Sequence, residues 1–199
     1  TAAPYGLKPV KRADGMPYAG ATSTYLIDPA GEATNIFNGQ VVTIGSDGYI
    51  ALATGTGADI TTNNLGGDTI GAIGVFMGCE YKNAEGQQIF SQYYPSGTAN
   101  GGPIKAYVVD DPNVLFQAQL DGTGAQTIIG TITKFAAQQS TSTGSTTTGV
   151  STSALDATVQ TTVGAFKIVG HVSDPSDAYP DVLVKITNGA HMMTMDTGV

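Results

Sequence analysis

Short apolar runs separated by dense turn signals dominate the pattern of this chain. Between Val114 and Leu120 apolar residues occupy every second position, which is typical of a strand with one face in a core. Asn-Gly and Asp-Gly pairs recur between such runs, and these pairs favour tight hairpin turns. The pattern predicts strands over residues 40–44, 49–52, 70–81, 87–94, 104–109, 114–120, 127–135, 163–172 and 182–187.

The fold class follows from the repeated strands and from the lack of a clear amphipathic helix of three or more turns. We expect an all-β protein, a single antiparallel β-barrel or β-sandwich with a jelly roll among the forms considered. Residues 1–20 read as an extended N-terminal arm, 21–190 as the β domain and 191–199 as a Met-containing C-terminal tail.

A Ser/Thr/Gly-rich stretch over residues 138–153 interrupts the β domain. Such a composition cannot build a core and is typical of flexible or extended connectors. We therefore expect a long loop that reaches a neighbouring molecule.

A weak internal echo lies on either side of this stretch. Residues 105–122 and 167–189 each read as strand, Asp-Pro turn, strand and Asn-Gly or Asp-Gly turn. Similar hairpins need similar turn residues, which explains the echo better than a duplication does. The echo favours placing both segments in one β domain.

Composition and charge narrow the class of protein. The 199 residues include 27 Gly, and 41% are hydrophobic against 12% charged, as in a folded, turn-rich chain. A net charge of −8 disfavours a phosphate backbone, so nucleic acid is not an expected partner. No apolar run is long enough for a membrane span, and the first residues do not resemble a signal peptide. Synthesis in the cytoplasm is expected.

Few residues offer chemistry. Cys79, expected to be a buried thiol, could pair with His171 only if the fold brought them together. Asp174, Asp177 and Asp181 could hold calcium, but the EF-hand order is missing, and Asx turns in a solvated loop explain these carboxylates adequately. The adjacent pair Asp110 and Asp111 is better explained as a turn. The sequence predicts no catalytic, cofactor or metal site, and no enzyme.

Partner binding is the remaining expectation. Three of the eight cations fall within the first twelve residues, and such a basic arm suits an acidic protein neighbour; a solvated terminus is the alternative. Some tyrosines flank turns or the arm, which suits interfaces or a sugar-binding platform: Tyr5, Tyr18, Tyr25, Tyr93 and Tyr94. Methionines adapt to uneven apolar surfaces. The candidate binding residues are Tyr5, Lys8, Lys11, Arg12, Met192 and Met193. Deleting residues 1–12 should then weaken binding while the body stays folded.

Several runs of the chain resemble one group of proteins. These are residues 3–10 (APYGLKPV), 106–116 (AYVVDDPNVLF), 149–156 (GVSTSALD) and 166–170 (FKIVG), with a looser match over residues 186–191 (ITNGAH). They are similar to structural proteins of tailed-phage virions, particularly those of marine podovirus-like phages. None of the runs is a mechanistic signature.

The resemblance implies a place on the virion, as a capsid decoration or cement protein. Such a protein would bind the major capsid protein and form a homo-oligomer, with a trimer favoured. The alternative is a tail, fibre or neck module that binds a host receptor or glycan. No catalytic residue is carried over by the resemblance.

Overall fold

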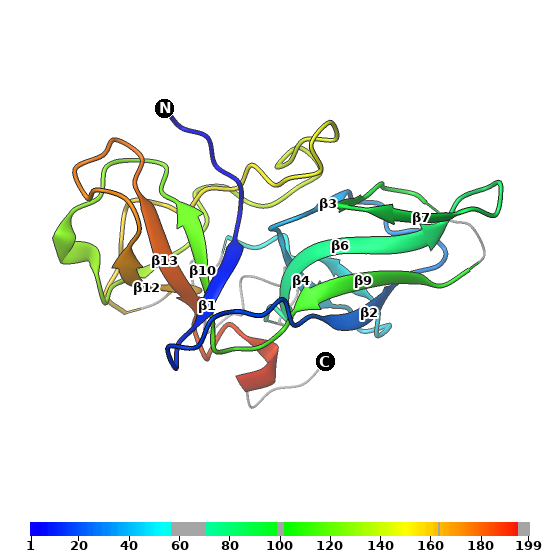
Figure 1. Ribbon diagram of the computed structural model, residues 1–199, viewed down its shortest axis with the longest axis horizontal. Coiled ribbons are helices and arrows are strands. Elements are labelled where there is room, and N and C mark those ends of the chain that lie inside the picture. Colours follow the sequence, from blue (N-terminus) through cyan, green and yellow to red (C-terminus); the bar gives the residue numbers. More distant parts are fainter. Residues whose placement is uncertain (57–70, 99–101, 163, 195–199) are drawn as a thin grey trace.

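The computed structural model describes residues 1–56, 71–98, 102–162 and 164–194, and these form an all-β protein. Two antiparallel sheets lie side by side along the long axis of the molecule (Figure 1). The first sheet contains, in spatial order, β1 (Lys8–Arg12), β10 (Val114–Gln119), β13 (Asp181–Ile186), β12 (Phe166–His171) and β11 (Ile132–Thr133).

The second sheet is built around the long strand β6 (Gly74–Lys82). Its order is β2 (Ser23–Ile27), β9 (Ile104–Val109), β6, β4 (Val41–Ile44) and β5 (Ile50–Leu52), and β7 (Gln88–Ser91) also pairs with β6. A small ribbon joins β3 (Ile36–Phe37) to β8 (Tyr93–Tyr94). Two 3-10 turns, Gln126–Ile128 and Met192–Thr194, complete the described elements.

Of the two architectures that the sequence left open, the sandwich is consistent with the structure and the closed barrel is wrong. The second sheet curls until its edge strands β2 and β5 approach each other. In the part of the chain that the structure describes, however, no hydrogen-bonded ladder joins these two strands. The edges therefore remain open.

Two hydrophobic cores hold the sheets. The first core lies between them, where Phe116 and Phe166 of the first sheet pack in the same cluster as Val75 and Val109 of the second. The second core fills the concave side of the curled sheet and includes Phe76. Because the first core takes residues from both sheets, the two sheets stabilise each other.

Most predicted strands are confirmed. The alternating residues from Val114 to Leu120 point into the first core, as the period of two predicts. The hairpins β4–β5 and β6–β7 form where short turns ending in glycine, at residues 45–48 and 83–86, separate two apolar runs. The predicted strand over residues 127–135 is wrong, because a 3-10 turn and Gly130, with φ of 87°, leave only Ile132–Thr133 in the ladder.

The internal echo covers two different connections. β12 and β13 form a hairpin within the first sheet. β9 and β10 do not pair, because the chain crosses from the second sheet to the first between them. Both segments nevertheless belong to one structure, since β10 pairs directly with β13.

Candidate binding surfaces

The predicted N-terminal arm is largely part of the fold. Lys8–Arg12 pair with β10 as an edge strand of the first sheet, with a bulge between Pro9 and Lys11. The preceding Leu7 is 1% exposed and belongs to the first core. The basic segment is therefore an edge strand held on the body.

Tyr5 faces inward. Its hydroxyl is buried and lies near the side chains of Asp181 and Gln117. Burial and the nearby Asp181 carboxylate raise the pKa of this phenol above its ordinary value. Asp181 also accepts a hydrogen bond of 3.0 Å from Gln117. Tyr5 thus contacts β10 and β13 of its own chain rather than presenting its hydroxyl to a partner.

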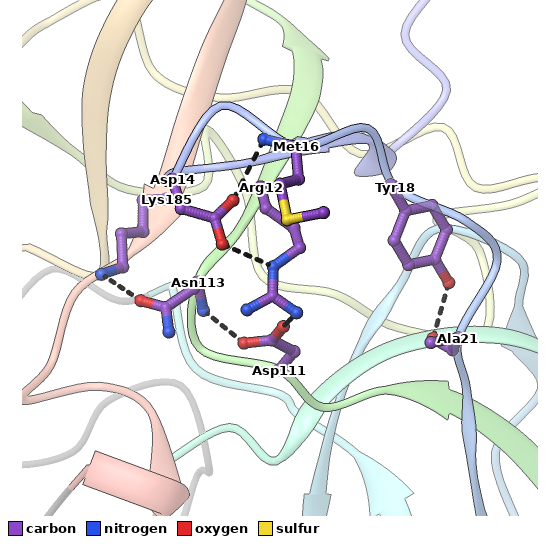
Figure 2. Close-up of polar contacts among 8 residues, drawn as sticks. All are labelled: Arg12, Asp14, Met16, Tyr18, Ala21, Asp111, Asn113 and Lys185. Carbon is purple, nitrogen blue, oxygen red and sulfur yellow. Dashed lines mark hydrogen bonds and ion pairs between the residues drawn. The ribbon is translucent and has the colours of Figure 1, made fainter.

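Arg12 is bound within the molecule (Figure 2). Its guanidinium lies 3.2 Å from Asp14 and 3.0 Å from Asp111. Asp14 also accepts the backbone N–H of Met16, which closes the turn after β1. Arg12 therefore joins this turn to the crossing between β9 and β10, and its charge is neutralised there.

Lys8 and Lys11 differ from Arg12 because both are exposed and neither forms an ion pair with the residues that the structure describes. Val10 and Met16, in the same hairpin, are exposed apolar side chains. We call Lys8, Val10, Lys11 and Met16 the N-terminal patch. It is the exposed remainder of the predicted basic arm.

The two predicted methionines have different surroundings. Met192 is partly buried against the second core, while Met193 is 59% exposed. The Met193 N–H donates to Nδ1 of His191 over 3.2 Å, and His191 itself is buried. Of this pair, only Met193 exposes most of its side chain to solvent. The remainder of the predicted tail, residues 195–199, lies outside the described residues.

The Ser/Thr-rich segment packs on its own chain. Gln139 is buried and bonds the backbone of Val41 and Ala53. Further along, Ser151 donates its N–H to the carbonyl of Asn38 over 2.9 Å. Figure 1 shows the segment, in yellow, running from the first sheet toward β3. The expected excursion to a neighbour is instead a strap across the molecule.

A surface that the sequence did not single out lies on the convex face of the second sheet. Cross-strand partners point to the same face, and the registers align four residues across β2, β9, β6 and β7. These four, which we call the outer row, are Leu26, Lys105, Glu80 and Phe90. Leu26 is 45% exposed and Phe90 is 71% exposed.

The centre of the outer row is an ion pair. Nζ of Lys105 lies 2.8 Å from Oε1 of Glu80, and this contact lowers the pKa of the carboxyl. Beside the row, a shallow hollow over Gly78 is bordered by Phe90 and Tyr107. Strand alternation could have placed these side chains on one face, but only the pairing of distant strands puts them in a row.

The tyrosines considered as a sugar-binding platform each make a different contact within the chain. The hydroxyl of Tyr18 donates to the carbonyl of Ala21 and that of Tyr25 donates to Asp110, each over 2.8 Å. Tyr93 stacks on Phe37 with ring centroids 5.4 Å apart, and Tyr94 is buried. These tyrosines are held in place individually and do not form one exposed platform.

The structure does not join Cys79 to His171. Cys79 lies in the second core, where burial raises the pKa of its thiol to about 12, and the thiol donates to the carbonyl of Tyr93 over 3.5 Å. His171 is at the end of β12 in the first sheet, where Nε2 lies 3.1 Å from the carbonyl oxygen of Ala125. The sequence-based alternative of a Cys–His dyad is therefore wrong.

Two of the three aspartates of the predicted loop, Asp174 and Asp181, have separate partners. Asp174 accepts hydrogen bonds from the N–H and the hydroxyl of Ser176, an Asx turn that lowers the pKa of its carboxyl. Asp181 instead lies in β13, bonded to Gln117. No group of three potential metal ligands occurs among the described residues.

Comparisons with known proteins do not identify a family for this chain. No family model, curated protein or solved structure matches this chain. Among the described residues, no helix is both long and apolar enough to span a membrane.

Proposed function

We propose that this chain is a non-enzymatic structural protein of a tailed-phage virion that decorates and stabilises the capsid. It would bind the lattice of the major capsid protein, and the virion surface would be its location. The runs of sequence that resemble phage structural proteins support this assignment. The observation that carries the contact is the N-terminal patch, where two cations without an ion pair to the described residues project from a protein of net charge −8.

The backbone around the patch favours recognition through side chains. The outer edge of β1 offers little to a further strand, because Pro9 has no N–H and the N–H of Arg12 already donates to Met16. Lys11 also bridges Pro17 across the hairpin. The lysines and the apolar Val10 and Met16 are left as the binding groups. Many such small contacts over a lattice give avidity without a large interface per copy.

The test is binding of the purified chain to heads of the phage that encodes it, prepared without this protein. A Lys8→Ala/Lys11→Ala variant should occupy the heads at a level at least severalfold lower. Added salt should likewise weaken the binding of the unmodified protein to the heads, because salt screens exposed charges. Lys167→Ala, a change of an exposed lysine on β12, is the matched control and should bind normally.

Labelling of the protein on intact virions separates this function from the alternative. Label on heads supports the capsid assignment, and label confined to tails or fibres supports a receptor- or glycan-binding module instead. Absence of label from virions would overturn both. Equal occupancy by the double lysine variant and the control would exclude the N-terminal patch as the contact.

A further inference from the structure

The outer row is self-complementary, which points to a specific occupant for the convex face of the second sheet. In spatial order it reads apolar, cation, anion, apolar: Leu26, Lys105, Glu80 and Phe90. A two-fold axis parallel to the strands, placed between β9 and β6, exchanges the two halves of this row. We propose that a second copy of this chain docks face to face on the outer row.

Each contact of this arrangement is favourable. Lys105 of one copy lies over Glu80 of the other, and the same pair recurs across the axis, as an isologous interface requires. Leu26 of one copy then meets Phe90 of the other, so that both exposed apolar side chains leave water. A two-fold axis that lies in the interface but runs along the row, perpendicular to the strands, would instead place Lys105 over Lys105 and Glu80 over Glu80. The order of the row therefore selects one geometry.

Local charge also favours a second copy here. The molecule as a whole carries −8, so two copies repel each other in general. Within the outer row one cation, Lys105, is paired with one anion, Glu80, so the row carries no net charge. Two copies that meet by this face consequently avoid the acidic repulsion of the rest of the surface.

The area of the convex face of the second sheet limits the strength of the proposed dimer. The four strands have 5, 6, 9 and 4 residues, so at about 3.3 Å per residue and about 4.8 Å between strands they offer on the order of 400 Å² per copy. The total of about 800 Å² for two copies is smaller than a standard specific interface and in the range of weak, transient ones. We therefore expect a weak, reversible dimer that forms only at high protein concentration.

Analytical ultracentrifugation of the full chain over a wide concentration range tests the proposal. The unmodified protein should show a monomer–dimer equilibrium. Phe90→Ser should weaken the dimer at least tenfold, since exposed aromatic anchors dominate small interfaces. Val169→Ser, which changes an exposed apolar side chain on β12 of the other sheet, is the matched control and should leave the equilibrium unchanged.

Charge exchange tests the geometry. Lys105→Glu and Glu80→Lys should each weaken the homodimer, because like charges then face each other. An equimolar mixture of the two variants should form a heterodimer, since every facing pair is again opposite in charge. Circular dichroism of each variant checks that the fold is kept.

Four results would overturn the proposal. These are a monomer at every concentration, a trimer, a dimer that Phe90→Ser leaves unchanged, and a mixture of the charge variants that fails to associate. A glycan that binds a monomeric protein through Phe90 would also assign the face to a different ligand. The proposal concerns a surface apart from the N-terminal patch, so head binding and dimer formation can each fail alone.

Discussion

At the residue scale, a few polar side chains stabilise the fold in ways that the composition of their segment does not indicate. Gln139 stands in a stretch that reads as a linker, yet its amide accepts from the N–H of Val41 and donates to the carbonyls of Val41 and Ala53, at 2.9, 3.1 and 2.7 Å. The side chain thus satisfies the Val41 N–H and the Ala53 carbonyl at the ends of β4 and β5, while the Val41 carbonyl also accepts the N–H of Ala53. One glutamine fastens the Ser/Thr-rich segment to the second sheet.

We predict that Gln139→Met destabilises the protein by roughly 2–4 kcal/mol, because the Val41 N–H and the Ala53 carbonyl lose their partner without gaining water. Urea denaturation measures the change. The neighbouring Gln138 is exposed, so Gln138→Met should alter the free energy of unfolding by less than about 0.5 kcal/mol. Equal effects of the two substitutions would show that the segment is not fastened by Gln139.

His191 gives stability a pH dependence. Burial lowers its pKa from 6.5 to about 4, and although Asp110 and Asp111 oppose this shift, Lys185 adds to it. The folded pKa is below the unfolded one, so the unfolded chain binds more protons at this residue between these values. Its contribution to stability is therefore present above pH 6.5 and is lost as the pH falls toward 4.

Unfolding free energies measured by urea at several pH values should decrease by roughly 3 kcal/mol over this window on account of His191. In His191→Gln, which cannot titrate, this part of the decrease should be missing, although the variant is less stable at neutral pH. Subtracting the two curves removes the carboxylates that titrate in both proteins. Parallel curves would contradict the assignment to His191.

At the scale of elements, β1 changes how the N-terminal segment should be tested. Leu7 and the ladder to β10 place residues 7–12 inside the cooperative fold. Deletion of residues 1–12 should therefore destabilise the body, contrary to the expectation from sequence. Loss of the buried Leu7 alone costs about 2–5 kcal/mol, and the exposed edge of β10 invites aggregation.

Circular dichroism with thermal unfolding and light scattering of the truncated chain checks this prediction. Removal of residues 1 and 2 alone is the control, because it leaves Ala3, whose N–H donates to Gln119, in place. That shorter deletion should unfold like the unmodified protein. A 1–12 deletion that stays monomeric and equally stable would restore the view of a free arm.

At the scale of the whole molecule, the shared first core makes two sheets into one structure. The two candidate surfaces lie on different sheets, the N-terminal patch beside β1 and the outer row across to β7, at separate parts of the long axis (Figure 1). A neighbour bound at one surface leaves the other free. A lattice-binding protein that also pairs with its own copies would need this separation.

Sequence reasoning recovered the strands whose signal is local. β9, β10 and β13 follow from apolar runs between turn pairs, because one face of each is buried and turn chemistry sets its ends. β1 was missed because its charged and proline-containing sequence has no strand pattern of its own. The candidate binding residues divide in the same way. The exposure of Lys8 and Lys11 could be predicted from the sequence, while the neutralisation of Arg12 by Asp111 could not.

The sequence by itself determined that this protein is all-β, since alternation and hairpin turns are properties of neighbouring residues. Only the tertiary structure decided that the sheets stay open, that the basic segment is an edge strand and that the Ser/Thr-rich segment is a strap. It also aligned Leu26, Lys105, Glu80 and Phe90 in one row. The physical reason is that pairing between distant strands depends on the shared cores, and no local pattern encodes which strands meet.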